Sequence, residues 1–584
     1  MTNMIKTFSG FLLLTLALGF TAGCSERPPA SAIASAHPLA TQAGMEILDK
    51  GGNAFDAAVA VTAALGVVEP YASGLGGGGF YLLHQARSKD GDDKQVMLDA
   101  REKAPLAAHR DMYLGDDGEV IAGASLVGPL AAGVPGIPAA IDHLARNYGK
   151  LPLSISLAPA IRLARQGFKV DRSYRRYINF RLRAIQQDPQ TAEIFLKWGA
   201  VPPAGTTIVQ QDLASTLEII AQKGRAGFYG GDIARKLVDG VRAAGGIWTL
   251  DDLKQYRVIE RQPIIGEYRG TRIISAAPPS SGGVAIMTML NMLNTRAQDD
   301  VTKLSSVARA HLIIEAMRRT YRDRAEFLGD TDFVAVPVKR LTSMQHARQL
   351  RDSIDSGING GINGGKATPS SELNSNELID AKTSTGAGNN TSHFSILDSQ
   401  GNRVAATLSI NYPFGASFVP KGTGVLLNDE MDDFSARPGT PNAYGLIGDD
   451  ANAIEPGKRP LSSMSPTFLE NDRGIAILGT SGGSRIISMV LLAILEFHEG
   501  GDAASMVSKP RFHHQYLPDR VFYEPESFSD AEQAALQAMG HTLQKVANGS
   551  HYGNMQAVVW DKKTDRITAA SDKRGIGQAE VKEN

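Results

Sequence analysis

The sequence predicts an α+β protein, with helical stretches before residue 391 and a larger share of strands after it. Two stretches, 134–167 and 213–237, repeat apolar residues with a period of about 3.6 and are expected to be helical, the second with a break at Gly230-Gly231. After Thr391 apolar residues recur at every second position, which is typical of strands. The 584 residues are enough for several domains, yet one large fold of two sheet layers could absorb most of them.

Composition and charge exclude some partners. The formal net charge is −1, so there is no electrostatic reason to expect nucleic acid or an acidic membrane surface as a partner. Hydrophobic residues make up 42% of the chain, which is ordinary for a globular protein. Cys24 is the only cysteine, which excludes an intramolecular disulfide and a cysteine-based metal site.

Residues 1–24 have the pattern of an export signal. Lys6 supplies a positive start, and the apolar run 11–20 is too short to span a bilayer. The run leads into Thr21-Ala22-Gly23-Cys24, which is similar to a bacterial lipoprotein signal, where the cysteine is lipidated and becomes the mature N-terminus. The alternative is ordinary signal cleavage near Ala34 or Ala36. Either way we expect an exported protein, in the periplasm, with a membrane as partner only through a lipid on Cys24.

The first part of the chain is expected to pass from helices to strands. Residues 38–70 are rich in small side chains, which let helices approach closely. Gly74–Gly79 matches the dinucleotide pattern G-x-G-x-x-G, but a helix precedes it and the apolar strand 80–83 follows, the reverse of what that motif needs. A short strand is expected at 96–100, and Arg101 follows it directly. Arg101 either forms a surface ion pair or binds a carboxylate with two hydrogen bonds from its planar guanidinium group.

A loose tract and a buried strand meet at Thr391. The tract, 355–389, follows a strand at 272–275 and an amphipathic helix at 311–327, and it is rich in Gly, Ser, Asn and Thr. If the bond between Asn390 and Thr391 is cut, Thr391 gains a free amine that can act as base for its own hydroxyl. The alternative is an uncut hairpin strand after a disordered loop. The strand residues expected to face one way are Phe394, Ile396, Val404, Ala406 and Leu408.

Two polar segments follow the strand. The acidic run 428–434 lies between apolar residues, so some of its carboxylates are expected to point into a pocket. The Pro- and Gly-rich loop 436–458 contains Tyr444 and is of a length typical of a functional lid or a disordered segment.

The glycine turn after the buried strand 474–478 has two interpretations. Gly479-Thr480-Ser481-Gly482-Gly483 satisfies G-x-S-x-G between a strand and an apolar helix, the context in which an α/β-hydrolase carries its nucleophile. Ser481 would then need an acidic and a basic partner, for which Asp519, Asp530, His541 and His551 are available. Alternatively, the N–H groups of Gly482 and Gly483 form an oxyanion hole, because only glycine allows so close an approach.

These blocks occur in an order that resembles the γ-glutamyltranspeptidase (glutathione hydrolase) family of N-terminal-nucleophile hydrolases. The resemblance runs from about residue 34 to about residue 571 and rests on GGNAFDAAVA, GLGGGGF, AREKAP, GVPGIPAA, PPSSGG, TSHFS, NDEMDDFS, KRPLSSMSPT, GTSGGSR and PRFHHQ. It implies a four-layer αββα sandwich of two stacked, antiparallel-rich sheets. It also implies a precursor cut into a large subunit, 25–390, whose end is a flexible tract, 355–390, and a small subunit, 391–584; together they form one composite domain.

The resemblance also implies a role for each matching residue. Thr391 is the nucleophile, and Gly482 and Gly483 form the oxyanion hole. Ser409 supports the nucleophile where the family commonly has Thr; it keeps the hydroxyl but lacks the methyl group that fixes χ1. Tyr444 belongs to the lid. The groups expected to hold the α-carboxylate of a γ-glutamyl group are Arg101, Ser462 and Ser463, and those expected to receive its α-amine are Asn411, Glu430 and Asp433.

The implied reaction moves a γ-glutamyl group from glutathione or a similar compound to water, an amino acid or a dipeptide, with no metal or organic cofactor. The charges agree, because the α-carboxylate needs a cation and hydroxyl donors while the α-ammonium needs carboxylates. Two alternatives stay open: a cephalosporin-type acylase of the same superfamily, and a surface lipoprotein that binds γ-glutamyl compounds without turnover. The intact glutamate-binding set argues against the first, and Thr391 with both oxyanion glycines argues against the second.

Overall fold

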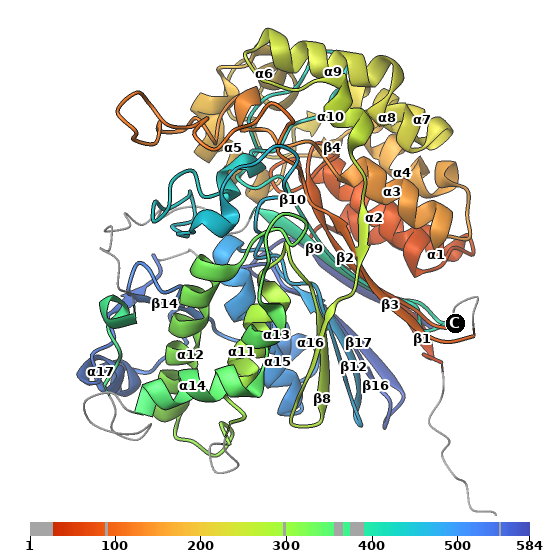
Figure 1. Ribbon diagram of the computed structural model, residues 1–584. Helices are drawn as coiled ribbons and strands as arrows, with labels where there is room; N and C mark the ends of the chain where they lie inside the picture. Colours follow the sequence, from red (N-terminus) through yellow and green to blue (C-terminus); the bar gives the residue numbers. More distant parts are fainter. Residues whose placement is uncertain are drawn as a thin grey trace, which may run out of the picture.

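Two large antiparallel sheets are stacked face to face, and helices cover the outer face of each sheet (Figure 1). The computed structural model describes residues 27–87, 91–295, 300–355, 366–373, 390–547 and 551–583. The predicted signal, 1–24, and Cys24 therefore lie outside the described residues. The four layers confirm the predicted αββα sandwich.

The first sheet has the strand order β18-β1-β9-β10-β2-β3-β6. Its strands are β1 (Ala30–Ser35), β2 (Gly78–Gln85), β3 (Lys94–Ala100), β6 (Ile259–Arg261), β9 (Thr391–Leu397), β10 (Arg403–Ser409) and β18 (Gln578–Glu583). The register of β9 and β10 pairs Thr391 with Ser409. The residues predicted to face one way do so, because all five belong to the apolar core between this sheet and its helices: Phe394, Ile396, Val404, Ala406 and Leu408.

The second sheet has the order β17-β16-β12-β11-β8-β7. Its strands are β7 (Ile264–Tyr268), β8 (Thr271–Ser275), β11 (Thr467–Asn471), β12 (Gly474–Gly479), β16 (Gln556–Asp561) and β17 (Arg566–Ser571). Its β12 and β16 lie against β9. A Cβ atom at position 479 would come within 2.3 Å of the His393 ring, so glycine is required where β12 passes β9. The side chains of β9 that do not face the helices thus lie between the sheets.

Helices from the first half of the chain cover the first sheet. They are α1 (Pro38–Asp49), α2 (Ala54–Val68), α3 (Ile137–Asn147), α4 (Leu153–Gln166), α5 (Arg172–Ile185), α6 (Pro189–Phe195), α7 (Gln211–Lys223), α8 (Arg225–Tyr229), α9 (Gly231–Ala243) and α10 (Leu250–Gln255). α2 begins at a capping box in which Asn53 and Asp56 satisfy each other's backbone N–H groups. The helices predicted in 38–70, 134–167 and 213–237 are confirmed, including the break before Gly231.

A second group of helices covers the other sheet: α11 (Gly282–Met292), α12 (Ser306–Phe327), α13 (Val338–Leu341), α14 (Met344–Asp355), α15 (Ile486–His498), α16 (Ala503–Ser508) and α17 (Asp530–Ala538). Small sheets are formed by β4 (Phe168–Lys169) with β5 (Thr207–Ile208), and by β13 (Phe512–His513), β14 (Val521–Tyr523) and β15 (Leu543–Lys545). No helix among the described residues combines the length and apolar character needed to cross a bilayer.

Part of the tract 355–389 has a defined structure, which differs from the prediction. Ser370–Leu373 forms the 3-10 turn η2, and Ser370 is fully buried. The Ser370 N–H donates to Asp519 Oδ2, and its hydroxyl donates to the Tyr516 carbonyl, both at 2.7 Å. The order here comes from contacts with residues almost 150 positions away, which the composition of the tract does not reveal.

β1 is an internal strand, paired with β18 on one side and with β9 on the other. Its residues Ala32, Ile33 and Ala34 are fully buried. Signal cleavage near Ala34 or Ala36, the alternative left open by the sequence, would remove most of this strand and leave β9 unpaired along one edge. Cleavage at either place is therefore hard to reconcile with this sheet.

We predict that a chain starting at residue 36 does not fold, whereas a chain starting at residue 27 does. The shorter chain loses the backbone hydrogen bonds on both sides of β1 and exposes the unpaired edge of β9. Soluble yield and thermal unfolding of the two chains measure the difference. Equal melting temperatures would show that β1 is dispensable.

Candidate active site

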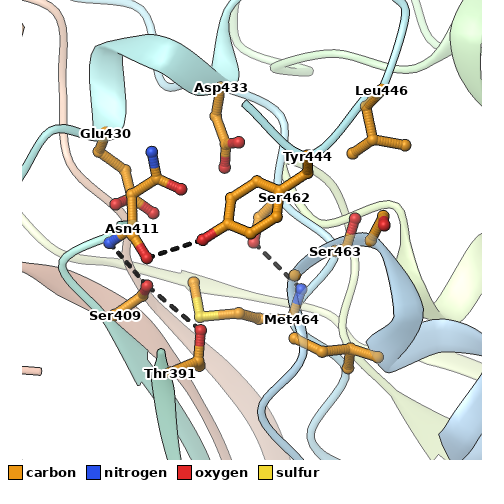
Figure 2. Close-up of a pocket in the computed structure, with 13 residues that line it drawn as sticks. Thr391, Ser409, Asn411, Glu430, Asp433, Tyr444, Leu446, Ser462, Ser463 and Met464 are labelled. Carbon is orange, nitrogen blue, oxygen red and sulfur yellow. Dashed lines mark hydrogen bonds between the residues drawn. The ribbon is translucent and has the colours of Figure 1, made fainter. Parts of the chain in front are cut away.

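Thr391 lies at the first position of β9, beside a small cavity (Figure 2). Its Oγ1 lies 3.4 Å from Oγ of Ser409, its register partner at the end of β10. The Ser409 oxygen also accepts the backbone N–H of Asn411 at 2.8 Å. A hydroxyl carries one proton, so Ser409 can direct that proton to Thr391 Oγ1. This geometry suits the supporting role predicted for Ser409.

The cavity brings together most of the residues predicted from the sequence. The predicted residues that line it are Thr391, Ser409, Asn411, Glu430, Asp433, Tyr444, Ser462, Ser463 and Gly483. Sequence reasoning missed four other lining residues: Leu446, Met464, Ser484 and Ile486. Arg101 and Gly482 do not line the cavity; Arg101 lies behind Glu430 and Asp433, and Gly482 directly precedes Gly483. With a volume of about 20 Å³, the cavity has room for little more than one water molecule.

A buried cluster of charges lies at one side of the cavity. Arg101, fully buried just after β3, forms ion pairs with Glu430 and Asp433. Its Nε donates to the Pro460 carbonyl at 3.1 Å, which fixes the plane of the guanidinium. Burial raises the pKa of the Glu430 carboxyl, although the nearby guanidinium of Arg101 opposes the shift. The cluster holds both signs of charge that a zwitterionic amino-acid head would need.

A second carboxyl group, Glu102, completes this cluster. Its Oε2 lies 3.5 Å from Nη1 of Arg101, and the side chain is fully buried. Burial, followed by the charge of Glu430, raises the pKa of Glu102 well above its usual range. The shift favours the protonated form of Glu102, which would reduce the negative charge beside the ion pairs of Arg101.

Ser462 and Ser463 come from a segment that is tied to the turn before α11. The N–H of Ser462 donates to the Pro279 carbonyl, and the N–H of Ser281 donates to the Ser462 carbonyl, both at 2.8 Å. The two blocks PPSSGG and KRPLSSMSPT are thus neighbours in space. Both serine side chains line the cavity, as a carboxylate-binding pair must; that role stays a prediction.

The glycine turn leads from β12 through the 3-10 turn η5 (Gly483–Arg485) into α15. Gly482 and Gly483 have φ values of 141° and 57°, in a region that favours glycine. A Cβ atom at position 483 would lie 2.7 Å from the Tyr444 ring, so the absent side chain also leaves space for the lid tyrosine. The turn therefore brings the backbone of Gly483 to the cavity, as the oxyanion-hole interpretation requires.

The α/β-hydrolase interpretation of this turn finds no support. Ser481 is fully buried and does not line the cavity, and its Oγ has no hydrogen-bond partner among the described residues. Asp519 is instead paired with Arg318 and with His514. A nucleophilic serine needs a histidine within hydrogen-bond reach, and Ser481 lacks one.

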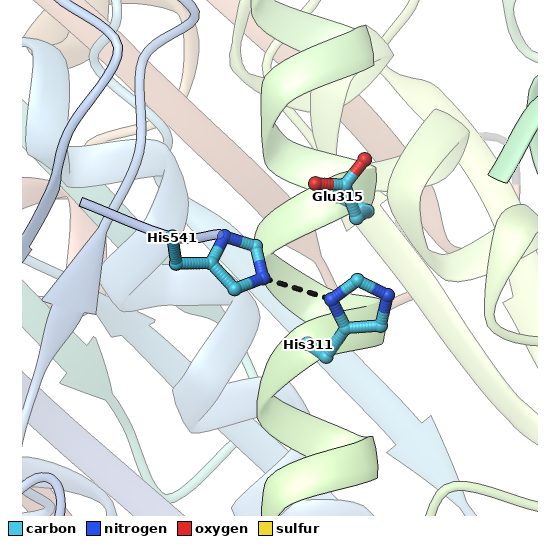
Figure 3. Close-up of side chains that lie close together, drawn as sticks. All are labelled: His311, Glu315 and His541. Carbon is cyan, nitrogen blue, oxygen red and sulfur yellow. Dashed lines mark hydrogen bonds between the residues drawn. The ribbon is translucent and has the colours of Figure 1, made fainter. Parts of the chain in front are cut away.

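His541, one of the two histidines considered as partners of Ser481, belongs to a separate buried cluster with His311 and Glu315 (Figure 3). The Nε2 of His541 lies 2.8 Å from Nδ1 of His311. Glu315 is already ion-paired with Arg318 and Arg319. A divalent cation at this place would face two neighbouring guanidinium groups, so we interpret the cluster as a buried polar network rather than a metal centre. The same network also supports η2, because Arg318 donates to the Ser370 hydroxyl at 3.0 Å.

The loop 436–458, for which the sequence allowed a lid, brings Tyr444 to the cavity beside Thr391. The Tyr444 hydroxyl donates to the Asn411 carbonyl at 2.8 Å, and Nδ2 of Asn390 donates to the Tyr444 hydroxyl at 3.1 Å. Asn390, the residue before the predicted cut, is itself buried under the lid. Tyr444 therefore contacts the residue before the predicted cut and lines the cavity beside Thr391, so it would have to move to admit a substrate.

Gln515 connects the lid to the glycine turn. Its Nε2 donates to the carbonyls of Tyr444 and Gly445, at 3.2 and 3.0 Å, and its Oε1 accepts the hydroxyl of Ser484 at 2.7 Å. His513 also contacts Oε1, at 2.9 Å. Gln515 lies within the PRFHHQ block, but nothing in the local pattern indicated this contact. The lid and the turn are thus held by one buried amide.

The fold and the site define a hydrolase of the N-terminal-nucleophile class. A family model described as Gamma-glutamyltranspeptidase matches residues 40–582. The glutathione hydrolase proenzyme of Escherichia coli (strain K12) is 41% identical over 549 residues, which cover 93% of this chain and 90% of that protein. The chain belongs to the γ-glutamyltranspeptidase family.

Solved structures give the same fold. The cephalosporin acylase from Bacillus halodurans matches with a TM-score of 0.78 at 26% identity, over 95% of this chain and 96% of that chain. The γ-glutamyltranspeptidase of Helicobacter pylori matches with a TM-score of 0.53 at 38% identity, over 93% of that chain but only 56% of this one. The Helicobacter pylori chain has the lower TM-score because it covers only 56% of this chain. Its sequence identity, 38%, is nevertheless higher than the 26% of the acylase.

We predict that Gln515→Glu loosens the lid. The carboxylate cannot donate to the carbonyls of Tyr444 and Gly445, and the closed state should lose about 1–3 kcal/mol, equivalent to about 5- to 150-fold in the closed-to-open ratio. Limited proteolysis within 436–458 measures lid opening. Gln544→Glu, the same change on β15, which lies outside the cavity, is the control. Equal cleavage rates in both variants would contradict the proposed contact.

Proposed function

We propose that this protein is a γ-glutamyltransferase and glutathione hydrolase whose nucleophile, Thr391, is released by self-cleavage. The observation that carries the proposal is the position of Thr391: it begins an internal strand, with Ser409 at 3.4 Å and the expected glutamate-binding groups around the same cavity. The curated relatives named glutathione hydrolase proenzymes, with high coverage and up to 41% identity, support both the substrate class and a processed precursor.

Maturation begins with attack of the Thr391 hydroxyl on the Asn390 carbonyl. The peptide bond becomes an ester as the acyl group moves from nitrogen to oxygen, and the nitrogen becomes the free amine of Thr391. Water then cleaves the ester, which leaves a carboxylate on Asn390 and restores the hydroxyl. The products are a large subunit that ends at Asn390 and a small subunit, 391–584.

In the mature enzyme the Thr391 hydroxyl attacks the γ-carbonyl of glutathione or a similar compound. The new α-amine, with a pKa of about 8 as for an ordinary N-terminus, accepts the hydroxyl proton and passes it to the leaving amine. The N–H groups of Gly482 and Gly483 stabilise the oxyanion, where one donor typically contributes about 3 kcal/mol. Cysteinylglycine leaves, and water or the amine of an amino acid or dipeptide then releases the γ-glutamyl group.

Substrate binding exchanges ion pairs within the buried charge cluster. The α-carboxylate of the γ-glutamyl group takes the place of Glu430 and Asp433 at Arg101, and the α-ammonium pairs with the carboxylates so released, together with Asn411. Ser462 and Ser463 donate to the same α-carboxylate. Because the cluster is buried, a substrate that lacks either charge leaves a protein charge unpaired, which is costly.

A cephalosporin-type acylase is the second candidate, because a solved structure with that title matches 95% of this chain. The buried carboxylates of Glu430 and Asp433 beside Arg101 favour the γ-glutamyl substrate. Turnover of γ-glutamyl p-nitroanilide and of glutaryl-7-aminocephalosporanic acid by one preparation distinguishes the two. Faster turnover of the cephalosporin would replace our assignment.

We predict that Thr391→Ala gives one uncleaved chain on a denaturing gel and no γ-glutamyl transfer, because the nucleophile of both steps is missing. Wild type should give two bands. Thr391→Ser keeps the hydroxyl and should cleave more slowly but completely. Ser481→Ala is the matched control, since it removes a hydroxyl from the neighbouring turn, and it should be cleaved like wild type. Activity in an uncleaved Thr391→Ala chain would falsify the assignment.

Export to the periplasm belongs to the same proposal, with a lipid on Cys24 as the membrane anchor. The stretch from Cys24 to Ala30 can reach at most about 20 Å. β1 and β9 are antiparallel, and Ala32 pairs with Leu397, so the start of β1 lies at the end of β9 that is distant from Thr391. The lipid would therefore hold the protein with the active site facing away from the membrane.

We predict that the intact mass of the large subunit from the native host corresponds to Cys24–Asn390 plus a diacylglyceryl and an acyl group. Cys24→Ala should shift the protein from the membrane fraction to the soluble periplasmic fraction without changing its activity. A mature N-terminus elsewhere before Ala30, without lipid, would retain export and exclude the anchor.

A further inference from the structure

We propose that Arg324 is a positioning residue for substrate binding: it orients the hydroxyl groups that receive the α-carboxylate and supplies the positive charge that Arg101 alone does not. The inference rests on the proposed function and concerns a residue outside the motifs that point to it. Arg324 lies in the last turn of α12, 95% buried, in the segment before the predicted cut.

Arg324 donates to two serine oxygens. Its Nε lies 3.0 Å from Oγ of Ser281, and its Nη2 lies 3.3 Å from Oγ of Ser463. Among the described residues Arg324 forms no ion pair, in contrast to Arg318, Arg319 and Arg322 on the same helix. A buried guanidinium without a carboxylate partner is costly, so its position is itself an indication that an anion completes the site.

The direction of each hydrogen bond determines what Ser463 can offer to a ligand. A guanidinium group has only donors, so the Ser463 oxygen must act as the acceptor. Its single proton has no acceptor among the described protein groups and, because Ser463 lines the cavity, can point into it. Ser463 is thereby set as a donor, which suits an incoming carboxylate and does not suit an ammonium group.

The Ser281 hydroxyl connects Arg324 to the backbone of Ser462. The Ser281 oxygen accepts from Arg324, and its proton goes to the Ser462 carbonyl at 2.7 Å. The Ser462 oxygen in turn accepts the backbone N–H of Met464 at 3.1 Å, so its proton is also free to point into the cavity. Arg324 therefore orients the Ser463 hydroxyl directly and, through Ser281, holds the backbone of Ser462 in place.

The charges of the pocket require a second cation. Arg101 faces the carboxylates of Glu430 and Asp433, so without Arg324 the described pocket would carry one more negative than positive charge. Arg324 adds a second guanidinium to the two carboxylates that form ion pairs with Arg101. A zwitterionic γ-glutamyl head then enters without a net change in charge, whereas a head that lacks the α-carboxylate leaves Arg324 without an anion.

Substrates that lack one charge each provide the test. Glutaryl p-nitroanilide keeps the carboxylate and lacks the amine; 4-aminobutanoyl p-nitroanilide keeps the amine and lacks the carboxylate. With Arg324→Gln we expect kcat/KM to fall about 10- to 100-fold for the γ-glutamyl and glutaryl anilides, mainly through KM, as for a lost charge-assisted hydrogen bond. The 4-aminobutanoyl anilide should change less than about twofold. Arg324→Lys should retain the charge and restore part of the loss.

The controls separate this inference from the proposed function and from misfolding. Arg322→Gln changes a neighbouring arginine that pairs with Asp323, and all three substrates should behave as with wild type. A wild-type protein that does not turn over the γ-glutamyl anilide refutes the proposed function. An Arg324→Gln chain that is cleaved normally but loses all three activities equally, or none, refutes the role of Arg324.

A second variant covers the case in which Arg324→Gln does not fold. Ser281→Ala removes only the link between Arg324 and the Ser462 carbonyl. We expect it to raise KM severalfold for the two substrates that carry the carboxylate and to leave the 4-aminobutanoyl anilide unaffected. An equal effect on all three substrates would likewise overturn the inference.

Discussion

The antiparallel register between β9 and β10 is the constraint on which the rest of the site depends. It sets Thr391 opposite Ser409 at the open end of both strands, and the alternation of side chains then sends Phe394 and Ile396 into the helical core. A slip by one residue would turn Thr391 toward that core and bury an apolar residue between the sheets. The register is secured on the other side by β12, because glycine at 479 admits the His393 ring. Packing between the two sheets thus determines where Thr391 and Ser409 lie at the ends of β9 and β10.

The second constraint is that the buried carboxylates of the pocket are paired with Arg101 while no substrate is bound. These pairs keep the pocket closed and small. Arg101 is neutralised by the carboxylates expected to bind the substrate amine, and Tyr444 and Asn390 occupy the space around Thr391. In the uncut chain Arg101 therefore has its own carboxylate partners, whereas Arg324 has none among the described residues. A γ-glutamyl head can replace these contacts only because it carries both charges in a fixed arrangement, so the groups that keep the empty site stable also select its ligand.

Much of this arrangement could be predicted from the sequence, because several signals are local. The change to period two identified the buried face of β9 and β10, and the glycines at 482 and 483 marked a turn with unusual backbone angles. The G-x-S-x-G motif gave a wrong alternative because it too is a local signal. A strand, a glycine turn and a helix give the same sequence pattern whether the serine is a nucleophile or the backbone N–H groups form an oxyanion hole. Arg324, Gln515 and the buried turn at Ser370 could not be found, because the partners that connect them to the site or to the core lie 31 to 149 positions away. Helical periodicity marks α12 as amphipathic but does not say which of its arginines lacks a carboxylate.

The topology explains how a backbone cut can serve catalysis without separating the protein into two. In the first sheet β9 and β10, which follow the proposed cut, pair with each other. They lie between two strands from before the cut: β1 pairs with β9, and β2 pairs with β10. In the second sheet β11 pairs with β8 across the same division. Each proposed subunit therefore contributes strands to both sheets, and neither has a complete core of its own. Cleavage releases one amine at the end of β9, while both flanking strands and the sheet behind still hold the threonine in place.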